Sequence, residues 1–406
     1  MAKTLVEDLE KTRIPFLRGI LIRSLQDSGL DFEEASSIAS DIRNKLANTA
    51  LITTEDLSRK VIERLTSLGK KSVVHRYENR NSPITVEVEQ QCGRINPFSR
   101  LKFRHSLETI GLNANESDDV VRMLQDHLAN KSIKIIKSRN LAMLIYRYLR
   151  QSSKLGPAVA NRWLVWHDFI NSGRPLIFLL GGTAGCGKSS TANTLANRLE
   201  IVRTQSTDML REVMRTMIPE QLMPVLHQSS FTAWKGLPGQ QRNKGEVSDE
   251  LLVQGYRSQA DLLALAIEAV VERTTRERVS LVLEGVHMHP AFMEKLQAET
   301  DTVVIPIMLG LLQRKHLAQR IKARSTNVPD RGRAHYLQYF DEIWRLQTYL
   351  LSEADRANIH IAVNENRDKV FSEIMRFTIA TLAEDFDSTP ERVFGAKAFV
   401  DDDRLT

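Results

Sequence analysis

The sequence predicts an α/β protein with a three-layer domain built on a parallel five-stranded sheet, preceded by a mainly helical duplicated region. Three observations lead to this prediction. Five short segments that predict strands alternate with segments of helical spacing between residues 160 and 385, which is the pattern of a parallel sheet. A glycine-rich segment follows the first of these strands. Residues 1–152 contain an internal repeat, which indicates two copies of one small unit.

The repeat begins with IPFLRGILIRSLQDSGL at Ile14 and returns as NPFSRLKFRHSLETIGL at Asn96. Each copy predicts a short β segment (TLVEDL or ITVEVEQ), then turn residues, and then three helices. A Pro-Phe pair stands where the first helix is expected to open, because the missing N–H of proline costs little there. We expect one unit over residues 1–70 and a second over residues 84–152.

The two units resemble the ATP-cone, a small nucleotide-binding regulatory module, in their hairpin, P-F-x-R and S-L-x-x-x-G-L pattern. The resemblance implies binding of ATP or dATP through a lysine-arginine pair on the hairpin. Neither copy has that pair: the first has Lys11 and Arg13 nearby, and the second has Arg94. A nucleotide-binding role and a purely structural role are therefore both open for these units.

The first apolar segment, residues 176–180, runs into GGTAGCGKSS. Residues 182–189 fit G-x-x-x-x-G-K-S, the Walker A motif of P-loop NTPases, in its strand–loop–helix context. Glycines let backbone N–H groups wrap a polyphosphate, and the following helix presents its positive end to it. We expect Lys188 to bridge the β- and γ-phosphates of ATP and Ser189 to bind Mg²⁺. The predicted ATP-binding residues of the loop are Gly182, Thr183, Ala184, Gly185, Cys186, Gly187, Lys188, Ser189 and Ser190.

The segment STDMLREVMR follows the second expected strand, residues 201–205. Ligands of open parallel sheets bind outside the carboxyl ends of the strands, so Asp208 is placed to position or deprotonate an acceptor hydroxyl. Arg211, with Arg215 one helical turn later, is expected to grip an anionic acceptor. The alternative is that Thr207 or Asp208 caps the helix and that the arginines are ordinary surface residues.

Glu284 ends the third expected strand, residues 279–283, at the Walker B position. There it can hold the water shell of Mg²⁺ or touch the acceptor; an exposed strand-end carboxylate is the alternative. His287 and His289 follow, and because no other metal ligands cluster with them we favour a turn or substrate-facing role for His287. Residues 219–245 are too long for an idle connection and predict a substrate-covering insertion, with candidate contacts His227, Ser229, Ser230, Trp234 and Lys235.

A basic helix, RKHLAQRIKAR, and a polar loop, STNVPDRGR, follow the fourth expected strand, residues 302–309. They resemble the lid of nucleoside-monophosphate-kinase-like enzymes, whose arginines close over the phosphates and exclude water. The resemblance implies that Arg320 and Arg324 bind ATP, with Arg331 and Arg333 nearby in the loop. A solvated basic face is the alternative.

The fifth expected strand, residues 359–363, ends at Asn364, which we expect to lie towards the adenine. By analogy with the kinase group of P-loop proteins, the five strands should follow the order 2-3-1-4-5 in a P-loop kinase domain over residues 160–385. Residues 386–406 are expected to form an acidic tail.

Composition limits the function classes. The 406 residues are 42% hydrophobic and 26% charged, as in ordinary globular proteins, and no apolar run approaches the roughly 20 residues that span a bilayer. The net charge of +6 is modest and favours an arginine-lined site for phosphorylated ligands over nucleic acid. Two cysteines, Cys92 and Cys186, imply no disulfide framework. We expect a cytoplasmic protein with neither nucleic-acid nor membrane partners; its oligomeric state is open, and a homo-oligomer is compatible.

Five segments together resemble the 2-phosphoglycerate kinase family, which combines a P-loop kinase with an N-terminal ATP-cone-like region: GGTAGCGKSS, STDMLREVMR, LEGVHMHP, KARSTNVPDRGRAHYLQYFDEIWRLQTYL and IHIAVNEN. The resemblance covers nearly the whole chain. It implies ATP-dependent phosphorylation of a phosphorylated acid, with 2-phosphoglycerate giving 2,3-bisphosphoglycerate. The alternatives are another acceptor such as an inositol phosphate, a nucleotide-sensing regulatory protein, and a nucleic-acid end kinase. The mechanism we expect makes Lys188, Asp208, Arg211 and Glu284 catalytic, with Ser189 and Glu284 at the Mg²⁺.

Overall fold

The computed structural model describes residues 4–7, 13–28, 30–47, 49–70, 73–74, 77, 86–90, 92–131, 133–240, 247–298, 302–324 and 335–395. The chain folds into two compact units. The first comprises Met1–Glu89, Gly93–Phe98 and Leu128–Ile136, and the second comprises Gln90–Cys92, Ser99–His127 and Lys137–Thr406. The domain boundaries expected from the sequence stay a prediction. Lys11 and the tail from residue 396 onwards lie outside the described residues.

The first copy of the repeat consists of β1 Leu5–Glu7, β2 Arg13–Pro15, α1 Arg18–Asp27, α2 Phe32–Lys45, β3 Leu51–Thr53 and α3 Thr54–Ser67. Its sheet has the order β2-β1-β3, with β1 antiparallel to β2 and parallel to β3. Val6 and Ile52 pair across β1 and β3 and are both buried. They share one apolar core with Leu25, Ile42 and Leu65 of the three helices, so helix packing stabilises these very short strands.

The second copy consists of β4 Glu87–Glu89, β5 Ile95–Pro97, α5 Arg100–Thr109, α6 Ala114–Asn130, β6 Ile135–Lys137 and α7 Ser138–Gln151. The order of its elements along the chain matches the first copy, and its sheet order, β5-β4-β6, corresponds to β2-β1-β3. The internal repeat of the sequence is therefore also a repeat of topology.

The sequence suggested that each Pro-Phe pair opens a helix. The structure shows that neither pair does. Pro15 and Pro97 are the last residues of β2 and β5, and the helices begin at Arg18 and Arg100. Both strands lie at a sheet edge, where a residue without an N–H removes no ladder hydrogen bond. The third strand of each copy, β3 or β6, was not predicted.

The second compact unit contains a five-stranded sheet of order β11-β10-β7-β9-β8, and every pair of neighbours is parallel. Numbered by their place along the chain, the strands follow the predicted order 2-3-1-4-5. This order confirms the P-loop kinase fold. The strands are β7 Leu176–Gly181, β8 Arg203–Ser206, β9 Leu281–Glu284, β10 Val303–Gly310 and β11 His360–Val363.

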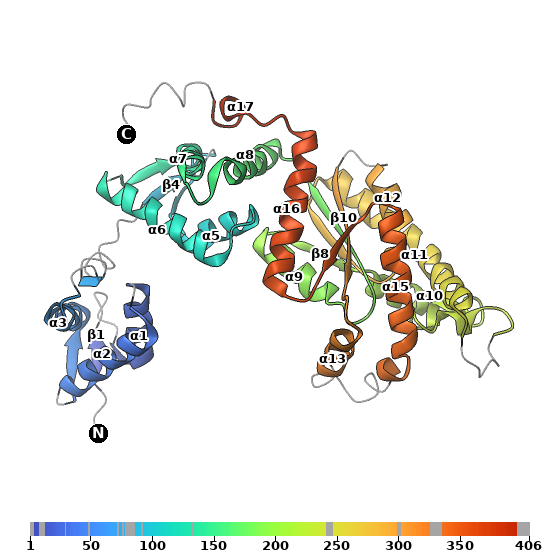
Figure 1. The fold of residues 1–406 in the computed structure, drawn as a ribbon, viewed down its shortest axis with the longest axis horizontal. Helices are drawn as coiled ribbons and strands as arrows, with labels where there is room; N and C mark the ends of the chain where they lie inside the picture. Colours follow the sequence, from blue (N-terminus) through green and yellow to red (C-terminus); the bar gives the residue numbers. More distant parts are fainter. Residues whose placement is uncertain are drawn as a thin grey trace. The chain divides into compact units, whose positions relative to one another are not determined.

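Helices cover both faces of this sheet, giving three layers (Figure 1). One face packs against α11, α12 and α15, and the other against α9 and α16; the buried Leu263 and Leu346 join the strand residues Ile177 and Leu283 in one core. Burial on both faces explains why β7, β9 and β10 are apolar almost throughout. The helices of this unit are α8 Gly156–Ser172, α9 Lys188–Arg198, α10 Thr207–Met217, α11 Asp249–Glu277, α12 Pro290–Ala298, α13 Arg314–Arg324, α15 Phe340–Arg356, α16 Arg367–Asp385 and α17 Pro390–Phe394, with the 3₁₀ helices η1 Pro224–His227 and η2 Ala233–Gly236.

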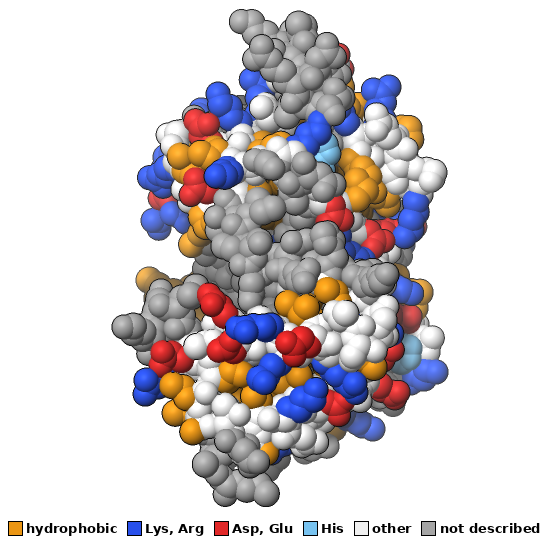
Figure 2. Space-filling view, turned by 90° about the vertical axis from the view of Figure 1, so that its left-hand side faces the viewer, with side chains coloured by type: hydrophobic (Ala, Val, Ile, Leu, Met, Phe, Trp, Pro, Cys, Tyr) orange, Lys and Arg blue, Asp and Glu red, His pale blue; other side chains and the backbone are white. Residues whose placement is uncertain are grey.

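Trp163 and Trp166 of α8 are core residues. Trp163 is 2% exposed, and its indole N–H donates to the carbonyl of Ala142 on α7 at 2.9 Å. Within the described part of the chain, no helix is long and apolar enough to cross a membrane. On the face drawn in Figure 2, the described Lys and Arg side chains are interspersed with Asp, Glu and apolar side chains and form no continuous basic band.

Candidate active site

The glycine-rich loop joins β7 to α9, with Gly187 as N-cap at φ 97° and Lys188 as the first helical residue. Gly182 and Gly185 also have positive φ, 138° and 85°, which side-chain-bearing residues rarely adopt. A Cβ on Gly182 would lie 2.5 Å from a carbonyl oxygen of β10, and one on Gly187 would lie 2.4 Å from Asn364 Nδ2. The loop therefore requires glycine both for its backbone conformation and for space.

The side chain of Lys188 lies over this loop. Its Nζ donates to the carbonyl of Thr183 at 2.8 Å, and the residue is 8% exposed. Thr183 is 1% exposed, and its Oγ1 has no hydrogen-bond partner among the described residues. A buried hydroxyl without a partner is unusual in a protein. Glycine backbone, a buried cation and this hydroxyl together fit a polyphosphate ligand.

The two residues expected at the metal are in direct contact. Ser189 Oγ, at the start of α9, donates to Glu284 Oε1, at the end of β9, at 2.9 Å. Glu284 is 9% exposed, so the alternative of an exposed strand-end carboxylate does not hold. Mg²⁺ binds through one or two protein oxygens while keeping waters and phosphate oxygens. This hydroxyl–carboxylate pair fits such an ion.

Arg320 of α13 and Asn364, directly after β11, both hold the carbonyl of Cys186. Arg320 Nη1 and Asn364 Nδ2 donate to that oxygen at 3.2 Å and 2.8 Å, and Arg320 Nη2 donates to the carbonyl of Asn364. Burial raises the pKa of the Cys186 thiol, which stays neutral in the loop. The side chain of Arg324, and all of Arg331 and Arg333, lie outside the described residues.

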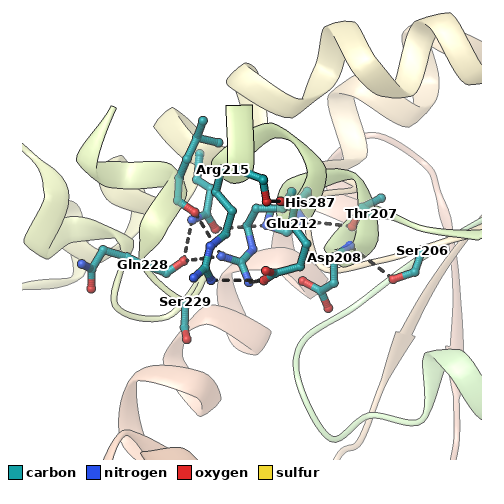
Figure 3. A network of polar contacts seen from close by, with 12 residues as sticks. Ser206, Thr207, Asp208, Glu212, Arg215, Gln228, Ser229 and His287 are labelled. Carbon is teal, nitrogen blue, oxygen red and sulfur yellow. Dashed lines mark hydrogen bonds and ion pairs between the residues drawn. The ribbon is translucent and has the colours of Figure 1, made fainter. Parts of the chain in front are cut away.

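Asp208 lies in the first turn of α10, and its side chain is exposed. The helix is capped by Ser206, whose Oγ accepts from the backbone N–H of Asp208 at 3.2 Å (Figure 3). The alternative that Thr207 or Asp208 is the N-cap therefore does not hold. Ser206 pairs with Glu284 across β8 and β9, and Glu284 pairs with Leu180 of β7. Asp208 and the phosphate loop therefore follow strands that end at the same edge of the sheet.

Thr207 and His287 begin a buried chain of side chains. Thr207 Oγ1 lies 2.9 Å from His287 Nδ1, and His287 Nε2 lies 3.0 Å from Gln259 Oε1 on α11; Figure 3 shows the first of these contacts. Burial lowers the pKa of His287 to about 4, so the ring is neutral at neutral pH. A Cβ on Gly285 would lie 1.7 Å from Thr207 Oγ1, which shows how closely β9 and α10 approach.

Gln259 was missed by the sequence analysis. Its Nε2 donates to the carbonyls of Val225 and Gln228 at 2.6 Å and 2.9 Å. It lies in the middle of a long helix, where a polar residue in an otherwise apolar stripe gave the only signal. Its side chain anchors the insertion to the sheet-covering helix.

Arg211, expected to grip the acceptor, contacts the insertion. Its Nη1 donates to the carbonyls of Leu226 and Gln228 at 3.0 Å and 3.2 Å, and its side chain is only 13% exposed. Arg215 forms an ion pair with Glu212 at 3.2 Å (Figure 3). Contact of either arginine with an acceptor stays a prediction.

Residues 225–237 of the insertion contain most of its contacts with other elements, whereas residues 219–222 are exposed. Ser229 Oγ lies 3.3 Å from His335 Nε2, His227 Nε2 lies 2.8 Å from the carbonyl of Ile218, and Trp234 is 3% exposed. Lys235 donates to the Tyr339 hydroxyl, with its ammonium 4.4 Å from that ring's centre. Ser230 is 8% exposed. Residues 241–246 of this segment lie outside the described residues.

His287 and His289 do not form a metal pair. His289 Nε2 lies 3.0 Å from the Tyr349 hydroxyl, whereas both ring nitrogens of His287 contact Thr207 and Gln259. No group of three or more His, Cys, Asp or Glu residues suited to a metal occurs among the described residues. The turn role favoured for His287 agrees with these contacts.

Comparison with known proteins decides the family. A 2-phosphoglycerate kinase of Pyrococcus horikoshii is 33% identical over 287 residues, which are 70% of this chain and 91% of that protein. The 2-phosphoglycerate kinase of Pyrococcus furiosus is 31% identical over 291 residues, or 71% and 92%, and that of Methanopyrus kandleri is 30% identical over 287 residues, or 70% and 85%. The chain belongs to the 2-phosphoglycerate kinase family. As a member of this family it is a kinase.

No protein-family model matches the chain. Among solved structures, a gluconokinase from Sinorhizobium meliloti 1021 and a shikimate kinase from Acinetobacter baumannii in complex with shikimate are similar at 16% identity. They cover 52% and 53% of this chain and 95% and 96% of their own, with TM-scores of 0.29 and 0.30. TM-scores this low carry no argument. The fold of this 2-phosphoglycerate kinase family member is established by its strand order and its phosphate loop.

Proposed function

We propose that this kinase transfers the γ-phosphate of ATP to the free hydroxyl of 2-phosphoglycerate, giving 2,3-bisphosphoglycerate. The names of its relatives support this acceptor. The strand register around Glu284, which pairs with Leu180 on one side and with Ser206 on the other, carries the proposal. This register brings the start of α9, which follows the phosphate loop, and the start of α10, which carries Asp208, to one edge of the sheet. In-line phosphoryl transfer requires such an arrangement of the ATP and acceptor sites.

The phosphate loop supplies the ATP site of this proposal. Backbone N–H groups around Gly185 and Gly187 would hold the phosphates, and Lys188 would exchange its bond to Thr183 for the β- and γ-phosphate oxygens. Arg320 and Asn364 keep the loop closed through the Cys186 carbonyl. Mg²⁺ held at Ser189 and Glu284 would neutralise charge on the phosphate oxygens.

The acceptor site of this proposal lies at the start of α10. Asp208 is exposed at the sheet edge, where its carboxylate can accept the proton of the acceptor hydroxyl or orient that hydroxyl. Arg211 and Arg215 are the proposed partners of the acceptor's phosphate and carboxylate. Their present bonds are to carbonyls and to Glu212, and an acceptor with two anionic groups offers Arg211 a stronger, charge-assisted partner than a carbonyl. We also propose that the enzyme works in the cytoplasm, where its two free cysteines stay reduced.

An ATP-consumption assay tests the proposal. Purified enzyme is incubated with Mg·ATP and 2-phosphoglycerate, other phosphorylated three-carbon acids, sugar acids or inositol phosphates, and the products are identified by mass spectrometry. Lys188→Ala is the blank, and Lys102→Ala, which removes an exposed lysine paired with Glu200, is the matched control. We expect 2,3-bisphosphoglycerate from the wild type and from Lys102→Ala only. Absence of that product from the wild type, or near-normal activity of Lys188→Ala, contradicts the proposal.

A further inference from the structure

The backbone carbonyls of segment 225–228 of the insertion accept hydrogen bonds from side chains of α10 and α11. Gln259 of α11 donates to two of them and Arg211 of α10 donates to two, so that the carbonyl of Gln228 accepts from both side chains at 2.9 Å and 3.2 Å. The other two acceptors are the carbonyls of Val225, bound by Gln259, and Leu226, bound by Arg211. The insertion is therefore bonded directly to the helix that carries Asp208.

These bonds fix the tautomer of His287. The Gln259 amide nitrogen uses its hydrogens on two carbonyls, so Oε1 is the amide atom that faces His287 and must accept. His287 Nε2 consequently carries the proton that is donated to Gln259. In the neutral ring, Nδ1 is then an acceptor, and the Thr207 hydroxyl donates to it. The hydrogen bonds thus run in one direction, from Thr207 through His287 and Gln259 to the insertion.

All three side chains of this hydrogen-bonded series are buried: Thr207 and Gln259 are 0% exposed, and His287 is 1% exposed. Removing one member leaves its neighbour without a partner away from water, which costs more than the bond itself contributes. The close approach of Gly285 to Thr207 leaves no room for the hydroxyl to find another partner on that side. These hydrogen-bonded side chains therefore form a rigid connection between the end of β9, α10 and α11.

We propose that His287 is a positioning residue whose Nε2–H tautomer joins the start of α10 to segment 225–228, so that Asp208 and the insertion move as one body. The inference rests on the proposed function in one respect, namely that Asp208 acts on the acceptor hydroxyl. The proposal has a consequence for how the enzyme selects its acceptor. An acceptor that engages the insertion also sets the position of the Asp208 carboxylate, so recognition of the acceptor and its reaction are coupled.

Substitutions at Thr207 test the connection with matched controls. Thr207→Val keeps the shape of the side chain but removes the donor to His287, whereas Thr207→Ser keeps the donor. We expect Thr207→Val to lower kcat by about tenfold or more through misplacement of Asp208, with KM for ATP unchanged, and Thr207→Ser to stay close to the wild type. Equal kcat values for Thr207→Val and the wild type, or equal losses in both variants, overturn the proposal.

Amide hydrogen exchange gives a second readout that needs no acceptor. The amides of Leu226 and Gln228 bond within the insertion, to the carbonyls of Met223 and Val225. If Thr207 is connected to this segment through His287, both amides should exchange faster in Thr207→Val and at the wild-type rate in Thr207→Ser. Unchanged exchange at both amides in Thr207→Val overturns the proposal. A wild-type enzyme that leaves 2-phosphoglycerate unreacted refutes the proposed function, while the exchange experiment still decides the connection.

Discussion

The hydroxyl of Ser189 and the carboxylate of Glu284 lie 2.9 Å apart, although 94 residues separate them in the chain. The contact exists because β7 and β9 are neighbours, with Leu180 and Glu284 in register. It joins the Walker A helix to the Walker B strand end, where we propose that a divalent ion binds between protein and phosphate oxygens.

Removing either oxygen should therefore change the metal requirement. We expect Ser189→Ala and Glu284→Gln to lower kcat and to raise the Mg²⁺ concentration that gives half-maximal activity, because each removes an oxygen that holds the ion or its water. Glu268→Gln, which breaks an ion pair between Glu268 of α11 and Lys295 of α12, is the control. Steady-state rates over a Mg²⁺ titration measure the effect, and an unchanged half-maximal concentration in both variants would count against the assignment.

Asp208 should act on the acceptor and not on ATP. In Asp208→Asn we expect kcat to fall by about a hundredfold or more, since an amide cannot accept the hydroxyl proton, while the Kd for ATP changes little. Glu268→Gln, which alters a carboxylate of α11 that pairs with Lys295 of α12, provides the comparison. Calorimetric ATP titrations and initial rates separate the two quantities. A variant that loses ATP binding but keeps its turnover when saturated would exclude an acceptor-side role.

Gly187 should be irreplaceable for two separable reasons. Gly187→Ala places a Cβ 2.4 Å from Asn364 Nδ2 at φ 97°, whereas Gly173→Ala has a comparable φ of 64° with nothing within 4 Å. The left-handed conformation costs each variant roughly 1–2 kcal/mol of unfolding free energy. Only Gly187→Ala should also lose ATP binding. Equal ATP affinities of the two variants would show that the close approach to Asn364 is unimportant.

Arg320 and Asn364 should act together on the phosphate loop, because both donate to the Cys186 carbonyl. We expect Arg320→Ala and Asn364→Leu each to weaken ATP binding. Their combined effect should depart from the sum by at least about 0.5 kcal/mol, as is usual for residues that share a partner. A double-mutant cycle on the Kd for ATP measures this coupling. Strictly additive effects would indicate that the two side chains act on ATP independently.

Stability should fall as the pH decreases through the range set by two buried histidines. Burial lowers the pKa of His167 and of His287 from 6.5 to about 4. Between these values the unfolded chain binds protons that the folded chain does not, so the folded state loses up to about 1.4 kcal/mol per pH unit for each histidine. His167→Phe keeps the ring packed on Trp163 but cannot titrate. Its unfolding midpoint should therefore drop less than that of the wild type between about pH 7 and about pH 5; an equally steep drop contradicts this origin.

The main sheet was predictable because β7, β9 and β10 are nearly continuous apolar runs separated by helices, and the Walker A loop identified the first of them. The strands of the duplicated region were harder, since three residues are too few to show an alternating pattern. Pro15 is an example. Its place before a predicted helix suggested a helix start, whereas its pairing with Leu5, next to the pairing of Val6 with Ile14, makes it the last residue of a strand.

The individual residues of the Walker motifs were predictable from local spacing, but the connections between them and the acceptor side were not. Three successive residues, Ser206, Thr207 and Asp208, can all cap a helix. Ser206 does so because Thr207 is turned into the core, where it contacts His287. The role of Gln259 likewise depends on residues 28 positions later and 31 and 34 positions earlier in the chain, and no local pattern encodes such distances.

The contact between Gly285 and Thr207 also constrains how this enzyme can change in evolution. A methyl group on residue 285 would overlap the Thr207 hydroxyl, because its carbon would lie 1.7 Å from Thr207 Oγ1. The same methyl group would lie 2.6 Å from Cβ and 2.7 Å from Cγ2 of Thr207, so loss of the side-chain oxygen at position 207 alone makes no room for a larger residue at 285. Descendants of this sequence should therefore keep glycine at position 285, while position 207 can change to a residue that keeps the hydroxyl, such as serine.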